Sequence, residues 1–257
     1  MRRQKSVLHA VLLLVTLSLA PSLLANADDS QPPSPADVSH ARVVSLSLVS
    51  GTVFARRPGS TKWESATVDT PVEEGVSIAT AKHSFAEVQF ENGSTVRLGE
   101  LSRVDFTQLA LAPHSGHINC LTLVVGFATI HVMPQRHDEY VLQASGASLT
   151  PHGKAEFRTD LNRGRLRVEV MSGHIQAADS EQSEQLRKNQ VLAYDQRDSG
   201  AFEVTDSIQI DEWDKWVQAR DRQQASLAGY SDGWDASIPF GFGGSMGPLA
   251  AALGDGF

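Results

Sequence analysis

The chain has 257 residues, 30 acidic and 22 basic, which gives a formal net charge of −8 at pH 7. This acidic balance provides no electrostatic reason to bind nucleic acid or anionic lipid. The single cysteine, Cys120, excludes an intrachain disulfide, and its place in the apolar run 118–125 predicts a buried structural thiol.

Residues 1–27 have the three parts of a secretory signal peptide. Three basic residues lie within the first five, the apolar run 11–19 is too short to span a membrane comfortably, and Ala25-Asn26-Ala27 is a cleavage sequence. We expect cleavage after Ala27, which removes three positive charges and gives a mature chain of net charge −11. The expected location is periplasmic or secreted; an uncleaved signal anchor is the alternative.

Residues 28–41 are rich in Pro, Ser, Asp and Gln and predict a linker. A β-rich body over 42–205 follows. In its clearest stretch, 71–109, Val88 and Phe90 alternate with polar residues, which is the period of a half-buried strand. Asn92-Gly93 predicts a type I′ hairpin turn. The other glycines expected at turns are Gly51, Gly75, Gly99 and Gly173.

Later segments repeat the same signals. Met171-Ser172-Gly173-His174-Ile175 repeats the turn at Ser50-Gly51-Thr52-Val53, and Gly126-Phe127 begins a third, looser copy. Asn189 occupies a position that suits a left-handed turn residue, and Trp63 is expected to plug one end of the core. Ten or more short strands between turns predict an all-β sandwich or roll.

The pattern changes after Asp206, and 206–227 is predicted to form an amphipathic helix. Ile210, Trp213, Trp216 and Val217 recur at helical spacing, and acidic residues precede basic ones along the segment. Trp213 and Trp216 are expected to pack on the β-body, with a partner-binding face as the alternative. The glycine-rich tail, 228–257, is predicted to be disordered.

These elements together resemble a FecR domain over residues 42–195. The resemblance rests on the order of 49–53, Ala86-Glu87-Val88-Gln89-Phe90, Val96-Arg97-Leu98-Gly99 and 171–175, and on the aspartate- and tryptophan-bearing helix that follows. It implies a jelly-roll-like β-sandwich of short antiparallel strands and a sensing or binding role in the bacterial envelope.

The sequence departs from the family pattern at two turns, with Val76 where an Asp is frequent and Asn189 in place of a usual Gly. Iron-responsive FecR regulators carry a cytoplasmic segment that holds a sigma factor before their membrane helix. Only Met1 to Lys5 precede the uncharged stretch that contains the apolar run here, so this interpretation is disfavoured, even with an uncleaved signal.

Motifs of enzymes and metal sites are weak. Gly243-Gly244-Ser245-Met246-Gly247 matches a nucleophile elbow, but no histidine follows His174 and the surroundings are glycine-rich. His114 and His117 lack a third ligand at a suitable spacing, and Asp232 and Asp235 do not complete a calcium loop. We expect no catalytic residue, metal or cofactor.

Three functional interpretations remain. The favoured one is a non-catalytic envelope binding or scaffold protein that contacts a protein or a glycan, with no nucleic-acid partner and no membrane span after signal cleavage. The alternatives are an unrecognised secreted hydrolase and, if the signal is uncleaved, a FecR-type transmembrane signalling regulator.

Overall fold

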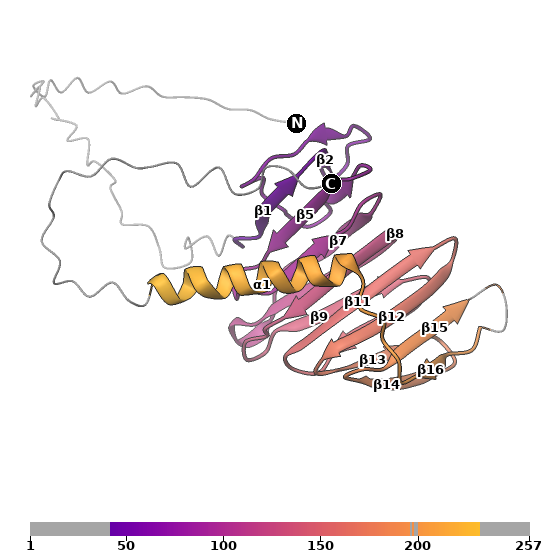
Figure 1. Ribbon diagram of the computed structural model, residues 1–257. Helices are drawn as coiled ribbons and strands as arrows, with labels where there is room; N and C mark the ends of the chain where they lie inside the picture. Colours follow the sequence, from indigo (N-terminus) through magenta and orange to yellow (C-terminus); the bar gives the residue numbers. More distant parts are fainter. Residues whose placement is uncertain (1–41, 196, 198–199, 232–257) are drawn as a thin grey trace, which may run out of the picture. The chain divides into compact units, whose positions relative to one another are not determined.

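The computed structural model describes residues 42–195, 197 and 200–231. The predicted signal peptide, linker and nucleophile elbow, together with Asp232, Asp235 and the tail beyond residue 231, lie outside the described residues. The described part is an all-β body followed by one helix, as predicted (Figure 1).

The strands form two sheets, which we call sheet A and sheet B. Sheet A has the order β1 (Ser45–Ser50), β5 (Phe85–Gln89), β6 (Thr95–Leu98), the second part of β8 (His117–Val132), β11 (Ala155–Asn162), β12 (Arg165–Ser172), β15 (Val191–Asp195) and β16 (Glu203–Thr205). Sheet B has the order β3 (Glu64–Ser65), β2 (Val53–Arg56), β4 (Ser77–Thr80), β7 (Arg103–Leu111), the first part of β8, β9 (Glu139–Ala144), β10 (Ala147–Pro151), β13 (His174–Ala178) and β14 (Ser183–Arg187).

The hydrophobic core lies between the sheets because every second residue of each strand points inward. In sheet A the inward set includes Val88, Leu98 and Ile130, and in sheet B it includes Ile78 and Leu149. Aromatic rings meet across the gap, since the ring of Phe90 lies 6.5 Å from Phe106 and 5.8 Å from Tyr140. The sandwich is therefore held by apolar packing.

Strand β8 belongs to both sheets. Residues up to Val125 pair with β7 and, in parallel, with β9, whereas Gly126 onward pairs with β6 and β11. The sequence suggested two strands here, separated at Gly126, and pure antiparallel pairing; one strand of 16 residues and one parallel pair are found instead. The bend falls at Gly126, whose φ is +87°.

The turn repeats seen in the sequence are corners at which the chain passes between the sheets. At Gly51 and at Gly126 a serine hydroxyl occupies the space that a side chain would need, 2.4 Å and 2.3 Å from an ideal Cβ. The same hydroxyls, of Ser84 and Ser102, each accept a hydrogen bond from the amide after the glycine, at 2.9 Å. At Gly173 the carbonyl oxygen of Lys154 fills the space. Glycine is required at these corners because both the φ and the close approach exclude a side chain.

The predicted turn at Asn92-Gly93 has a different conformation from the one expected. Asn92-Gly93 does not form a type I′ turn, because Gly93 has a positive φ and Asn92 does not. The Gly93 amide donates to Phe90, and the Phe90 amide donates to Ser94, which is the pattern of a three-residue hairpin loop. Asn92 instead bonds to Asp138 and Tyr140 through its side-chain amide. Gly75 and Asn189 have the expected positive φ, at +83° and +71°.

Three side-chain predictions were also wrong. Trp63 does not plug the core: its side chain lies outside, 36% exposed, with the guanidinium groups of Arg56 and Arg103 within 6 Å of its ring. Cys120 is half-buried, since its strand position faces away from the core, and burial raises the pKa of its thiol. Ile210 is exposed and precedes the helix.

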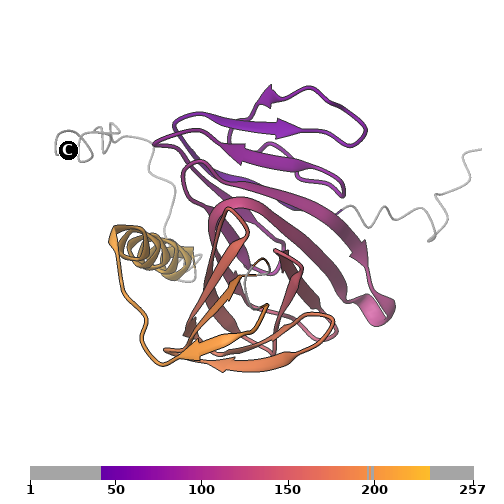
Figure 2. The same ribbon diagram turned by 90° about the vertical axis from the view of Figure 1, so that its right-hand side faces the viewer.

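The helix α1 (Glu212–Ser231) begins six residues after residue 206, the predicted start, and continues past residue 227, the predicted end. It lies across the strands of sheet A on the face opposite the core, and Figure 2 shows it nearly end-on, outside the strands. Among the described residues, no helix has the length and apolar character needed to cross a membrane.

Candidate functional site

The outer face of sheet A carries a row of charged side chains under α1. Strand register places Glu87, Arg97, Thr129, Arg158 and Glu169 side by side on β5, β6, β8, β11 and β12. These positions alternate with core residues such as Val88 and Val168, so the side chains point away from the core. We call these five residues the charged row.

The helix begins with a reciprocal cap that is tied to this row. The Asp214 amide donates to the Asp211 carboxylate at 3.1 Å, and the Asp211 amide donates to the Asp214 carboxylate at 2.9 Å. The two aspartates therefore form a capping box. Arg158 Nη1 lies 2.7 Å from Asp211 Oδ2 and 3.3 Å from Asp214 Oδ2. One arginine of the sheet thus holds the first turn of the helix.

An aromatic cluster lies beside this cap. Trp213 is buried, and its Nε1–H donates to the Thr129 hydroxyl at 2.9 Å. Its ring stacks on Trp216 at 4.8 Å and meets Phe127 edge-on at 5.2 Å, and Phe85 lies 5.5 Å from both tryptophans. The Trp213 face therefore packs on the β-body, the alternative that the sequence favoured.

Gly99 serves this cluster and is not a left-handed turn. An ideal Cβ on Gly99 would lie 1.9 Å from the ring of Phe127, so the ring occupies the space above the glycine. Phe127 in turn contacts Trp213 and lies 5.2 Å from the Arg158 guanidinium. The sequence analysis assigned Gly99 to a turn, whereas glycine is needed here because the Phe127 ring fills the space of a side chain.

The part of α1 from Arg220 onward, which we call its second half, is anchored by ion pairs and hydrogen bonds. Arg97 is fully buried and bonds to Glu87 at 2.7 Å and to Asp221 at 2.7 Å. Glu87, also fully buried, accepts further bonds from Arg220 at 2.9 Å and from Gln224 at 2.9 Å. Buried charges of this kind are tolerated only when they are paired and hydrogen-bonded.

The pKa values of these groups follow from their partners. Burial raises the pKa of the Glu87 carboxyl, but hydrogen bonds from Arg220, Arg97 and Ser47 outweigh it and hold the pKa below its usual range. The pKa of Asp221 is lowered in the same way, by His131 and Arg97 against burial. Glu156, which pairs with His131 across β11 and β8, has its pKa raised by burial and by the charge of Asp221.

The aromatic cluster is open on one side. Phe85, Phe127, Trp213 and Trp216 line a groove of about 480 Å³, which we call the aromatic groove. Its rim carries His83 and Glu100, joined by a 2.7 Å hydrogen bond from the His83 amide, and Glu212 and Lys215, joined by a 2.6 Å ion pair. Trp216 is half-buried and faces this space. An apolar floor of this size with a polar rim can hold an apolar side chain or a small ligand.

The histidines of interest from the sequence do not converge on a metal site. His117 bonds to Asp138 at 2.8 Å, and His114 lies against His137 at 5.6 Å. Within residues 42–195, 197 and 200–231, no three His, Cys, Asp or Glu side chains gather in a manner that could hold a metal.

The sequence analysis missed the charged row. Glu87 and Arg97 occupy outward strand positions, which predicts exposure, whereas both are fully buried by α1. The helix sequence held a signal of this burial. The face of the helix that contains the apolar Val217 also contains four polar residues, Asp211, Asp214, Asp221 and Gln224, so polar side chains lie between the helix and the sheet. Acidic residues within the packing face of a helix indicate basic partners beneath it.

Comparison with known proteins gives a match to one family model over part of the chain. Residues 76–176 match the family model described as FecR protein. No curated protein matches. Two crystal structures of a “putative anti-sigma factor” from Parabacteroides distasonis ATCC 8503, at 2.50 and 1.65 Å resolution, share 14% and 15% identity with TM-scores of 0.45 and 0.43. Each similarity covers 51% of this chain and 59% of the other, so it spans little more than half of that protein.

Proposed function

We propose that this chain, which carries a FecR domain over residues 76–176, is a non-catalytic binding protein of the bacterial envelope that holds a partner protein at the aromatic groove. The observation that carries the proposal is the groove itself, which four aromatic side chains line beside a helix fixed by buried ion pairs.

The chemistry of the groove favours a protein partner. Aromatic residues at a fixed, partly desolvated position are the usual anchors of protein interfaces. The rim presents both signs of charge, at Lys215 and at Glu212 and Glu100, which suits an apolar side chain flanked by polar peptide. A glycan is the other candidate from the sequence and is distinguished by the experiment below.

The buried ionisable groups support a non-catalytic role. Arg97 and Glu87 bond to each other and to α1, and Arg158 bonds to Asp160 and to the capping box of α1. Ion pairs of this kind hold structure, and each carboxylate among them is engaged by an arginine. Hydrolysis of an ester or glycosidic bond by the purified protein would overturn this part of the proposal.

Photo-crosslinking tests the groove. A photoreactive residue at position 215, on the rim, should give one predominant protein adduct in the envelope of the native host. Trp216→Ala should abolish that adduct, and Trp216→Phe, which keeps an aromatic surface, should retain it. The matched control places the photoreactive residue at the exposed Arg136, far along the chain on the β8–β9 connection. An adduct that survives Trp216→Ala, or one that carries saccharide in place of protein, would contradict the proposal.

The FecR family match also favours a second candidate, a transmembrane signalling regulator. Export with cleavage after Ala27 belongs to the first proposal, and retention of residues 1–27 belongs to the second. Intact-mass measurement of the envelope-associated protein separates them, since the exported binding protein should begin at Asp28.

A further inference from the structure

A second surface of sheet A, away from the aromatic groove, has a different chemistry. The β11–β12 hairpin turns through Arg163-Gly164, with φ of +52° and +84°. A two-residue turn with both φ values positive is type I′ and favours Asn-Gly or Gly-Gly. Here an arginine takes the first position, where a residue with a Cβ is disfavoured, so the turn presents a guanidinium group at a conformational cost.

Two more arginines meet Arg163 at this turn. Arg163, Arg165 and Arg197, with Asn162 and Asp195, line a hollow of about 600 Å³, which we call the arginine hollow. Gly164 allows the approach, because an ideal Cβ there would lie 3.3 Å from Arg197 Nε. All three arginines are exposed. The hollow gathers three positive charges on a chain whose net charge is −8.

Among the described residues that line the hollow, the one carboxylate is that of Asp195, and an arginine already neutralises it. Asp195 Oδ2 lies 3.0 Å from Arg165 Nε, and Asp195 Oδ1 accepts the Arg197 backbone N–H at 3.0 Å. These bonds hold the pKa of Asp195 below its usual range. Within the part of the chain that the structure describes, the guanidinium groups of Arg163 and Arg197 have no carboxylate partner. Two cations are therefore available to an anionic ligand.

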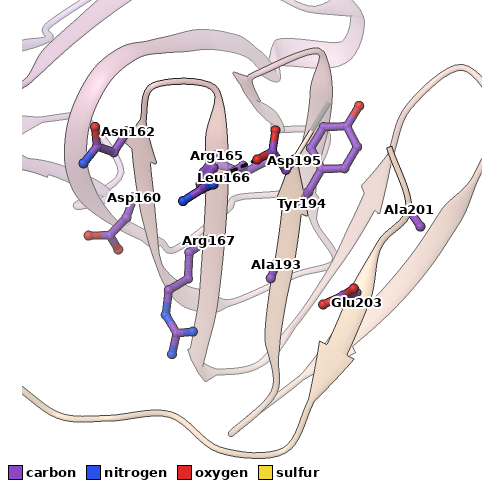
Figure 3. A pocket seen from close by; sticks show the side chains of 10 residues that line it. All are labelled: Asp160, Asn162, Arg165, Leu166, Arg167, Ala193, Tyr194, Asp195, Ala201 and Glu203. Carbon is purple, nitrogen blue, oxygen red and sulfur yellow. Dashed lines mark hydrogen bonds and ion pairs between the residues drawn. The ribbon is translucent and has the colours of Figure 1, made fainter. Parts of the chain in front are cut away.

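The hollow continues into a polar groove, shown in Figure 3, with which it shares Asn162, Arg165 and Asp195. This groove has a volume of about 410 Å³. Figure 3 places Asp160 and Arg167 on one side and Glu203 on the other. Tyr194, the only aromatic residue of the lining, is 6% exposed and offers little contact area. The carboxylate, amide and guanidinium groups of the lining can bond to sugar hydroxyls, and the apolar surface of Leu166, Ala193 and Ala201 can lie against the face of a sugar ring.

We propose that the arginine hollow and the polar groove bind an acidic glycan, with a sulfate, phosphate or carboxylate group between Arg163 and Arg197 and the sugar along the groove. Guanidinium groups pair with such anions through two parallel hydrogen bonds, which gives both strength and orientation. The site is separate from the aromatic groove and goes beyond the proposed function.

Titration calorimetry of the full exported chain tests the site, with a sulfated tetrasaccharide as the probe. Arg163→Gln with Arg197→Gln should weaken binding by about tenfold or more, the loss expected for charge-assisted bonds. The control pair Arg57→Gln with Arg136→Gln makes the same charge change elsewhere and should leave the affinity within about twofold. Equal losses in both pairs would show general attraction and overturn the proposal.

A third variant guards against misfolding. Arg163→Gly removes one guanidinium and suits the positive φ of the turn, so it should unfold at the same or a higher temperature while binding more weakly. Unchanged binding by this variant would count against the site.

Matched probes define the ligand class. A neutral tetrasaccharide of the same backbone should not bind, and its equal binding would overturn the role of the arginines. Equal binding of inorganic sulfate alone would overturn the role of the sugar groove, and tighter binding of an oligoglutamate peptide would identify an acidic peptide as the ligand. Trp216→Ala should leave the titration unchanged, so this proposal and the aromatic groove can fail separately.

Discussion

The two halves of α1 are held to sheet A by different means. The first half combines a capping box, a buried tryptophan and Arg158, whose partner Asp211 keeps 52% of its side chain exposed. The second half contacts the sheet through Arg97 and Glu87, both fully buried, and through Asp221, Arg220 and Gln224. Thr129, with its hydrogen bond to Trp213, lies between the two arginines in the strand register.

The first half of α1 supplies most of the free energy that binds the helix to sheet A, whereas the second half fixes the position of the helix along the sheet. Apolar burial of Trp213 and Val217 supplies net stabilisation at the first half. At the second half the cost of desolvating Arg97 and Glu87 offsets much of their attraction, and Arg97 Nη1 has no protein partner. A buried ion pair of this kind contributes little net free energy, yet a helix displaced by one turn would take Asp221 from Arg97 and Arg220 from Glu87, and would leave these two buried charges only each other. The second half therefore fixes where the helix lies.

Truncation after Thr205 removes both halves at once and has the largest expected effect. It exposes Phe85, Phe127 and the charged row, and it removes the burial of two indoles, at roughly 150–250 Å² for each fully buried ring. We expect the melting temperature to fall by about 10 °C or more, from several kcal/mol of lost burial, together with increased binding of a hydrophobic dye. If the truncated body melts unchanged and loses a partner instead, the tryptophans serve an interface and not the fold.

Substitution of each arginine by methionine compares the halves directly. Arg97→Met breaks the two 2.7 Å ion pairs that Arg97 makes with the buried Glu87 and with Asp221, and it leaves Glu87 with Arg220 as its ion-pair partner, so a loss of about 3–5 kcal/mol in the free energy of unfolding is expected. Arg158→Met should cost less, because solvent can reach Asp211. Urea unfolding measures both.

Glu87→Gln in the Arg97→Met background is the control for this pair. It removes the buried carboxylate charge that has lost Arg97 and should recover part of the loss. A larger loss for Arg158→Met than for Arg97→Met would contradict the assignment of the two halves.

Glu156→Gln has the smallest expected effect on stability, and it should stabilise the protein, whereas the two arginine substitutions should destabilise it. Because burial raises the folded-state pKa of Glu156, its ionised form is disfavoured, and the stability that this carboxyl gives in acid is lost as pH rises through that pKa. Glu156→Gln should therefore stabilise near neutral pH, with the gain fading as pH falls below the unfolded pKa of about 4.3. Thermal unfolding across pH checks this.

Asp221→Asn is the matched case of opposite direction. Its folded-state pKa is lowered, so the carboxylate contributes stability above its unfolded pKa that is lost as pH falls. The substitution should destabilise near neutral pH and have little effect in acid. The same pH profile for both variants would contradict the electrostatic account.

The sequence predicted those features that depend on local pattern. The alternation at Val88 and Phe90, the positive φ at Gly51 and Gly173 and the helix with Trp213 inward all follow from periodicity and turn chemistry. The burial of Arg97 could not be predicted in this way, because it depends on a helix more than 100 residues later in the chain. The prediction that Trp63 is buried was wrong for the converse reason. An aromatic residue is buried only where another part of the chain covers it, and here two arginine side chains lie over the ring.

The sharing of β8 by the two sheets has a consequence for how the body unfolds. The strands before it and the strands after it both depend on β8 for neighbours, through β6 and β7 on one side and β9 and β11 on the other. Neither set can leave without stripping hydrogen bonds from the same 16 residues. The strand thus acts as a mechanical coupling between the halves of the chain, so the body should respond to force or heat as one cooperative unit, although its length would allow two.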